Sequence, residues 1–217
     1  MLLLRPPGVY PAQGDTDLLI EALRRERPAP GARLLDLGTG SGAVALAAAG
    51  LGTRVTAVDL SRLALATAWV NARAHRLPLR LRRGDLTAPV AGSRFEFVVS
   101  NPPYVPAART GAPRHGIARA WDAGPDGRLL LDRVCRQAPH LLAPGGVLLI
   151  VQSCLADPAA TTAALRRAGL RTGTVAVRTQ PFGPVLTRRA AWLEQRGLIE
   201  PGEREETLVV VRGARPR

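Results

Sequence analysis

The chain has 217 residues, of which 46% are hydrophobic and only 4% aromatic, so it can bury one full core built mainly from Leu, Val and Ala. Its formal net charge is +13, and all 30 of its lysine and arginine positions are arginine. Such a charge suits a nucleic-acid or ribosomal partner and equally suits drift under GC-rich codon usage, so charge alone names no partner.

Cysteine and histidine content argues against a metal centre. The two cysteines, Cys135 and Cys154, lack ligand-like spacing, and the three histidines are scattered. We therefore expect no metal, and two buried thiols in a reducing compartment. The first residues are too few for a signal-peptide core and no apolar run approaches a membrane span, so we expect a soluble, cytoplasmic protein with no membrane partner.

The N-terminal half predicts alternating strands and helices. Residues 1–30 start with scattered proline and glycine and continue into a short helix, capped by Asp15 or Thr16, that ends before residue 28. The elements that follow are a strand at 33–37, a Gly-rich loop at 38–42, an Ala-rich helix at about 43–50, a strand at 55–59, a helix capped by Ser61, and strands at 79–83 and 95–100.

The C-terminal half starts with a long loop and then returns to this alternation. Residues 105–127 are rich in Gly, Pro and Arg, which predicts a functional loop. The expected elements beyond it are a helix near 128–142, a turn at 144–146, a strand at 147–151, a helix opened by Asp157-Pro158 and stopped by Gly169, a strand at 173–178, a polar helix around 187–197 and a strand at 207–212.

The alternation predicts a doubly wound α/β fold. Strands joined by helices form a parallel sheet covered on both faces, and right-handed crossovers place ligands outside the carboxyl ends of the strands. Four polar residues fall at such strand ends: Asp36, Asp59, Asp85 and Asn101. We expect a single domain, in which residues 1–30 pack on the cofactor site and residues 31–217 form the α/β unit.

The segment Asn101-Pro102-Pro103-Tyr104 is the most informative motif, and its four residues are the candidate catalytic set. Two successive prolines lack backbone N–H donors and fix φ at about −65°. The rim therefore offers acceptors, namely the Asn101 side-chain oxygen and the Pro102 carbonyl. Such a surface suits a planar –NH2 group and predicts chemistry on an amide or amino nitrogen. Tyr104 either packs on that planar group or belongs to the core.

The Gly-rich loop predicts a cofactor site of ambiguous type. Gly38, Gly40 and Gly42 let the backbone turn sharply and approach a ligand. With Ala43, the first two also satisfy the dinucleotide fingerprint G-x-G-x-x-A. Asp36 helps to decide, because a carboxylate there repels a pyrophosphate but can hold the ammonium of S-adenosylmethionine.

Two further aspartates suit the rest of such a cofactor. Asp59 ends the second predicted strand and is placed to accept hydrogen bonds from both ribose hydroxyls. Asp85 can accept from the adenine amino group, and Leu86 supplies a backbone N–H and an apolar wall. The alternative interpretation is that both aspartates only cap helices or turns.

With these residues in place, the chain resembles class I S-adenosylmethionine-dependent methyltransferases and, among them, the HemK family of protein glutamine methyltransferases, over nearly its whole length. The resemblance is carried by Tyr10-Pro11-Ala12 to Asp15-Thr16, the Gly-rich loop, Asp59, Gly84-Asp85-Leu86 and Asn101 to Tyr104. Residues similar to the short HemK-related branch of eukaryotes and archaea are His115-Gly116-Ile117, Ala120-Trp121, Gly124, Gly127-Arg128 and Asp132-Arg133. The resemblance implies a Rossmann-like, mostly parallel seven-stranded sheet whose last strands are antiparallel.

The resemblance also implies a cofactor, its contacts and a partner. The cofactor is S-adenosyl-L-methionine, with S-adenosyl-L-homocysteine as product. The implied cofactor contacts are Thr16, Asp36, Gly38, Asp59, Asp85, Leu86 and Asn101. Asn101 and Pro102 are implied to grip the substrate amide. In eukaryotes the short branch works with a small zinc-binding activator subunit, which makes such a subunit a possible partner.

Two departures from the family pattern accompany this resemblance. Long bacterial members carry an N-terminal helical domain that docks the release factor, whereas about 30 residues precede the first predicted strand here. Gln13-Gly14 stands where the short branch tends to have an acidic residue, which leaves the shape of the entrance open.

The predicted function is methylation of a glutamine side-chain amide, in the Gly-Gly-Gln motif of a peptide chain release factor. Alternatives are an amino methyltransferase of nucleic acid, acting on adenine N6 or guanine N2, a small-molecule or peptide N-methyltransferase, and a cofactor-binding scaffold without activity. Net charge favours nucleic acid, and the lack of an aromatic-rich basic patch counts against it. His115 and Trp121 are expected near the acceptor entrance, and Arg109, Arg114 and Arg119 contact RNA, an acidic partner or solvent.

Overall fold

The computed structural model describes residues 2–10, 13–111, 113 and 116–217. Seven strands form one sheet in the order β3-β2-β1-β4-β5-β7-β6. The strands are β1 (Arg33–Leu37), β2 (Arg54–Asp59), β3 (Leu79–Arg83), β4 (Phe95–Ser100), β5 (Leu142–Ser153), β6 (Arg171–Pro181) and β7 (Glu205–Ala214). The pairs among β1 to β5 are parallel, whereas β7 is antiparallel to both β5 and β6. The predicted fold class is confirmed.

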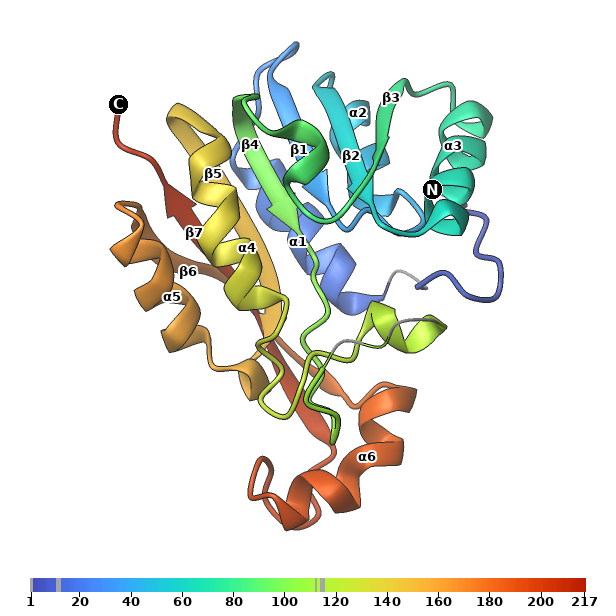
Figure 1. Ribbon diagram of the computed structural model, residues 1–217, viewed down its shortest axis with the longest axis vertical. Coiled ribbons are helices and arrows are strands. Elements are labelled where there is room, and N and C mark those ends of the chain that lie inside the picture. The colour runs from blue at the N-terminus through green and yellow to red at the C-terminus, as the bar shows by residue number, and fades with distance from the viewer. Residues whose placement is uncertain (1, 11–12, 112, 114–115) are drawn as a thin grey trace.

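Helices cover both faces of this sheet. They are α1 (Gly14–Arg25), α2 (Ala43–Gly50), α3 (Arg62–Ala74), α4 (Leu131–Gln137), α5 (Pro158–Arg167) and α6 (Pro184–Gln195). Figure 1 shows α4 and α5 in front of the sheet and α1 and α2 behind it. The central strands are apolar because both of their faces are covered, and Leu34, Leu35, Leu148 and Leu149 are fully buried. Burial of each such side chain contributes about 1.5–3 kcal/mol.

The edge strand β3 differs from the central strands in sequence and exposure. Its residues Arg80, Arg82 and Arg83 are all exposed. Charged side chains on an edge strand disfavour pairing with another chain. The arginines of β3 therefore suit an edge position.

Two predicted helix caps are confirmed, and one is wrong. Ser61 Oγ accepts from the N–H of Ala64, and Asp157 accepts from the N–H of Ala160 ahead of α5. At α1, however, the N-cap is Gln13, with no side-chain cap hydrogen bond. Asp15 and Thr16 lie inside the first turn, where both are buried. Their side chains form hydrogen bonds in the candidate active site instead.

Other predicted boundaries change for local reasons. The helix expected to 142 ends at Gln137 and continues as a 3₁₀ turn, Ala138–Leu141, because Pro139 lacks an N–H. The turn expected at 144–146 lies within β5, where the register against β4 shifts between Phe95 and Phe97. Cys135 is buried as expected, but Cys154 is exposed.

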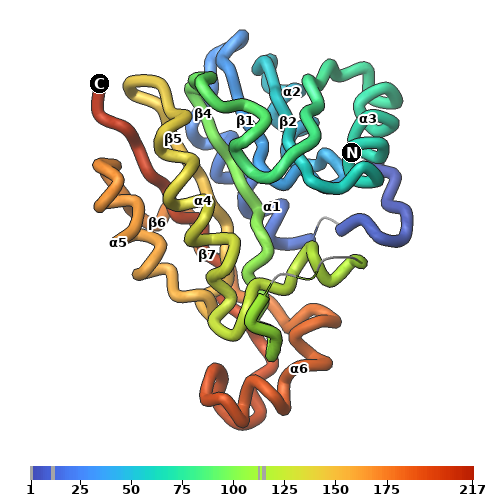
Figure 2. Tube along the Cα trace, in the orientation of Figure 1, coloured from blue at the N-terminus to red at the C-terminus, as the bar shows by residue number. Residues whose placement is uncertain are grey.

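Helix α6 extends beyond the sheet. It forms a small separate core with the residues that follow it, from Leu186, Ala190, Leu193 and Ile199. Figures 1 and 2 show α6 past the carboxyl end of β4, next to the chain that leaves this strand. The edge of the sheet that binds ligands in this fold is therefore enclosed by α1, by the loop after β4 and by α6.

Candidate active site

A cavity of about 1200 Å³ opens at the carboxyl edge of the parallel strands. The predicted site residues that line it are Thr16, Asp36, Gly38, Gly40, Asp59, Asp85, Leu86, Asn101, Pro102, Pro103 and Tyr104. A typical pocket for one small ligand measures about 300–1,000 Å³. This cavity is therefore large enough for a cofactor and part of a second molecule. The roles of these residues stay predictions, but their convergence is a feature of the fold.

The Gly-rich loop curls over the end of β2. Gly38 has a φ of +79° and Gly40 a φ of +54°, in the left-handed region that favours glycine. The N–H of Gly38 donates to the Val58 carbonyl at 2.9 Å, and that of Gly40 donates to Asp59 Oδ2 at 2.9 Å. The loop is thereby held against the second strand with its backbone at the cavity.

Gly42 is the N-cap residue of α2 and contacts α3. It is not among the residues that line the cavity in the described chain. A Cβ on Gly42 would lie 3.1 Å from the Cβ of Ala68 in α3, so glycine permits close packing of the two helices. This packing accounts for a glycine at position 42, and its role as a cofactor contact stays a prediction.

Asp36 is a buried acid at the end of β1, with 1% of its surface exposed. Its Oδ2 accepts a hydrogen bond of 2.7 Å from the Thr39 hydroxyl. Burial raises the pKa of Asp36 to about 7, the Thr39 hydrogen bond opposes this shift, and the nearby charge of Asp59 adds to it. A cation bound beside this carboxyl would stabilise its ionised form.

Asp59 is anchored through both of its oxygens. Oδ1 accepts from the N–H of Ser61 at 2.8 Å, and Oδ2 accepts from that of Gly40. Burial raises its pKa, and the backbone hydrogen bonds limit the rise. Asp59 thus does stabilise a turn, as the alternative interpretation expected. Each carboxylate oxygen still has a second lone pair, so Asp59 can also accept from a ligand hydroxyl.

Asp85 and Leu86 follow β3 and line the cavity. Asp85 Oδ2 forms an ion pair of 2.6 Å with Arg133, and half of the Asp85 side chain is exposed. Leu86 has a φ of +47°, an uncommon conformation for a non-glycine residue, and is half-buried. The sequence did not predict Arg133 as the partner of Asp85, and Arg133 itself lines the cavity.

The orientation of the Asn101 amide follows from a chain of hydrogen bonds. A carboxylate can only accept, so the Thr16 hydroxyl donates to Asp15 Oδ1, at 3.2 Å. The lone pair of the Thr16 oxygen then accepts from Asn101 Nδ2, also at 3.2 Å. With Nδ2 engaged, the side chain of Asn101 has Oδ1 left for a ligand. The acidic group thus dictates which end of the amide faces the acceptor.

Asp15 also binds two tyrosines. Tyr10 donates to Asp15 Oδ2 at 2.7 Å and Tyr104 donates to the same oxygen at 2.9 Å. Burial is the largest cause that raises the pKa of both phenols, and the charge of Asp15 is the next. Both phenols therefore remain donors. Tyr104 is buried within the main core and lines the cavity. Its predicted packing on a substrate amide stays a prediction.

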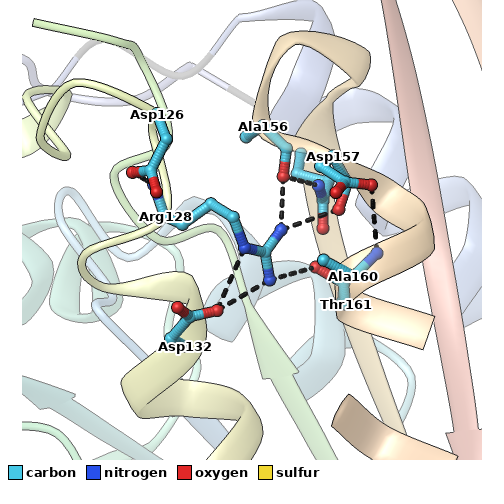
Figure 3. Close-up of polar contacts among 8 residues, drawn as sticks. Asp126, Arg128, Asp132, Ala156, Asp157, Ala160 and Thr161 are labelled. Carbon is cyan, nitrogen blue, oxygen red and sulfur yellow. Dashed lines mark hydrogen bonds and ion pairs between the residues drawn. The ribbon is translucent and has the colours of Figure 1, made fainter. Parts of the chain in front are cut away.

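The loop at 105–127 is anchored at its end by two residues. A Cβ on Gly127 would lie 2.3 Å from the Tyr104 carbonyl oxygen, so only glycine lets the loop pass so close to this residue. The buried side chain of Arg128 then ties the loop to α4 and α5 (Figure 3). Its guanidinium donates to Asp132 and to Thr161, and to the carbonyls of Ala156 and Asp157.

Helix α6 also holds this loop in place, through Arg189. Arg189 donates to the Pro106 carbonyl at 2.9 Å and forms an ion pair with Asp122. Trp121 and Arg119 line the cavity, and Arg119 lowers the pKa of Asp59 by its charge. Arg109 is exposed. His115 and Arg114, which were also expected here, lie outside the described residues.

The sequence assigned no place in the site to Tyr10, Asp15 or Arg133, which line the cavity, and did not predict that Arg189 holds the loop beside it. Asp15 was interpreted as a helix cap. Its burial in the first turn depends on Tyr104, which is 89 residues away in the chain. Among the described residues, no three His, Cys, Asp or Glu side chains are grouped so as to hold a metal ion. Nor is any helix of the described chain long and apolar enough to cross a membrane.

Known proteins support the resemblance seen in the motifs. The chain matches the family described as Methyltransferase small domain over residues 2–118. A release factor glutamine methyltransferase of Moorella thermoacetica is 40% identical over 153 residues, which are 66% of this chain and 54% of that protein. The chain thus spans about half the length of that relative.

Two relatives match nearly end to end. A protein of Methanocaldococcus jannaschii named for N5-glutamine methylation is 30% identical over 85% of this chain and 92% of its own length. The solved complex of Mtq2 with Trm112 from E. cuniculi, described by its role in methylation of the termination factor eRF1, has a TM-score of 0.66 and 25% identity, and covers 96% of this chain and 99% of that one. The predicted HemK-type resemblance is confirmed, and the chain belongs to the methyltransferase small domain family.

Proposed function

We propose that this protein transfers a methyl group from S-adenosylmethionine to the side-chain amide nitrogen of a glutamine in a peptide chain release factor. The observation that carries the proposal is the fixed polarity of Asn101. Its Nδ2 is held by Thr16, so that Oδ1 is the atom left for an acceptor –NH2 group. Asn101 lines the same cavity as the Gly-rich loop and Asp59.

The polar groups of the cavity suit S-adenosylmethionine. Asp36 is a buried acid with a pKa raised to about 7, which a cationic ammonium would return to its ionised form. Asp59 offers carboxylate lone pairs to ribose hydroxyls. The positive φ of Gly38 and Gly40 brings backbone rather than side chains to the ligand. When bound, this cofactor supplies an electrophilic methyl group on a positively charged sulfur.

The residues of the chain act on the acceptor nitrogen by position and charge. An amide nitrogen is a poor nucleophile because its lone pair is delocalised into the carbonyl. Asn101 Oδ1 and the Pro102 carbonyl would each accept one of its hydrogens, which orients the nitrogen toward the methyl group. Both oxygens also favour the positive charge that builds on nitrogen as the bond forms. Orientation of this kind is worth about 7–11 kcal/mol in favourable systems.

The identity of the acceptor is supported by the relatives. Several are named release factor glutamine methyltransferases, and one matching structure is of an enzyme that methylates a termination factor. That structure is a complex of Mtq2 with Trm112, which supports a small activator subunit for this chain as well. Zinc in such a subunit, a nucleic-acid partner and a cytoplasmic location remain predictions from the sequence.

One experiment tests the function. The purified protein, with and without a Trm112-type subunit, is incubated with methyl-labelled S-adenosylmethionine and, in turn, a release factor, RNA and DNA. We expect label in the release factor, and none when the glutamine of its Gly-Gly-Gln motif is replaced by alanine. Label in nucleic acid alone would favour the amino methyltransferase alternative and overturn the proposal.

A further inference from the structure

Glu206 in β7 is a buried acid that the proposed mechanism does not use. Only 7% of its surface is exposed. Its Oε1 accepts from Gln180 Nε2 at 3.1 Å, but its Oε2 has no hydrogen-bond partner in the part of the chain that the structure describes. Burial raises the pKa of Glu206, and the Gln180 amide and Ser153 hydroxyl partly offset that shift. A buried polar atom without a partner is costly and calls for an explanation.

The position of Glu206 points to the acceptor end of the cavity. It lines the same cavity as Asn101 and Tyr104. Its charge contributes to the raised pKa of Tyr104 and of Tyr10, so it lies near both phenols. Asp36 and Asp59, in contrast, interact with each other at the proposed cofactor end.

Two phenol donors near Glu206 have another partner, and the Ser153 hydroxyl, which lowers the pKa of Glu206, does not complete a hydrogen bond to Oε2. Tyr10 and Tyr104 both donate to Asp15 Oδ2. Gln180 reaches Glu206 because residue 14 is glycine: a Cβ there would lie 2.1 Å from Gln180 Oε1. Gln180 donates to Oε1, so Oε2 is the carboxylate oxygen that lacks a donor among the described residues.

We propose that Glu206 Oε2 accepts a main-chain N–H of the acceptor polypeptide next to the reacting glutamine. This inference rests on the proposed function, in which Asn101 and Pro102 take both hydrogens of the side-chain amide, so that a third donor must come from elsewhere on the substrate. A polypeptide carries such donors in its backbone. Charge does not single out a cationic donor, because the described part of the cavity carries both signs: Arg83, Arg119, Arg133 and Arg188 beside Asp15, Asp36, Asp59, Asp85 and Glu206.

The first test measures KM for the release factor with three variants. Glu206→Leu removes both acceptor oxygens and should raise KM by about tenfold, with kcat and the cofactor Kd within about twofold of wild type. Glu206→Gln keeps one oxygen and should stay within about threefold of the wild-type KM. The exposed neighbour Glu205 gives the control, since Glu205→Leu should change nothing. Thermal unfolding and cofactor binding show that each variant is folded.

The second test identifies the donor. Short Gly-Gly-Gln peptides, each with one backbone amide replaced by an ester, are titrated calorimetrically in the presence of S-adenosylhomocysteine. One ester should weaken binding to wild type about tenfold and leave binding to Glu206→Leu almost unchanged.

Three results would overturn the assignment of Glu206: an unchanged KM in Glu206→Leu, a loss in Glu206→Gln as large as in Glu206→Leu, or no ester that discriminates between wild type and Glu206→Leu. If wild type does not methylate the release factor at all, the proposed function itself fails.

Discussion

Replacement of Asp36 by asparagine should stabilise the free protein and weaken cofactor binding. Asp36 is 1% exposed, and burial raises its pKa from 3.8 to about 7. The folded state therefore keeps a proton on Asp36 between those pH values, where the unfolded state has released it. As pH rises through this window, the contribution of Asp36 to the free energy of unfolding must fall.

The size of this effect follows from the shift. About three pKa units at 1.36 kcal/mol each give at most about 4 kcal/mol between pH 4 and pH 8. Asparagine keeps an oxygen for the Thr39 hydroxyl but buries an –NH2 group, which costs about 1–3 kcal/mol. The net gain of Asp36→Asn should thus reach ~1–3 kcal/mol at pH 8 and vanish or reverse near pH 4.

Urea unfolding of both proteins at pH 4, 5, 6, 7 and 8, without cofactor, measures this difference. The stability gain should grow from pH 4 to about 7 and then level off. In parallel, wild-type affinity for S-adenosylmethionine should fall as pH drops below about 7, because a neutral Asp36 no longer attracts an ammonium. A gain that is independent of pH would show that Asp36 is not a strained buried acid, and the reasoning about the ammonium site would fail with it.

Substitutions at three further positions separate the acceptor role from the cofactor role. Asn101→Ala should lower kcat by orders of magnitude and leave the cofactor Kd within about tenfold, and equal losses in both would assign Asn101 to the cofactor. Thr16→Val frees the Asn101 amide to rotate and should lower kcat about two- to tenfold, whereas Thr16→Ser keeps the hydroxyl and should retain activity; similar rates in both variants would remove Thr16 from the orienting role. Asp59→Asn turns an –NH2 group toward the N–H of Gly40 or Ser61 and should raise the cofactor Kd about tenfold or more, measured by calorimetry, and an unchanged Kd would exclude the ribose role.

Much of the sheet could be predicted because its strands are short apolar runs that end in a polar residue. Asp36 lies one residue before the end of β1, Asp59 ends β2 and Asn101 follows β4, so a parallel sheet brings them to one edge. The Gly-rich loop could be placed for the same reason. The packing of Gly42 on Ala68 could not be predicted, since spacing alone cannot separate backbone approach to a ligand from approach to another helix.

The rest depends on contacts between distant residues. Asp15 looks like a helix cap in the sequence, and only its contacts with Tyr10 and Tyr104 show why it is buried. Glu206 lies in a strand whose local sequence does not mark it as a site residue. Nothing local indicates that Gln180 contacts it, in a position that a side chain at residue 14 would obstruct. Pairings of this kind follow from the tertiary fold and leave no periodic signal in the chain.

The central claim is that Asn101 and Pro102 present oxygens to an acceptor –NH2 group. The most direct test is a crystal structure with S-adenosylhomocysteine and a Gly-Gly-Gln peptide. We expect the glutamine Nε2 to donate to Asn101 Oδ1 and to the Pro102 carbonyl at about 2.7–3.2 Å, with Asn101 Nδ2 still on Thr16. A glutamine that turns its carbonyl oxygen to Asn101 Nδ2, or binds away from this rim, would contradict the account.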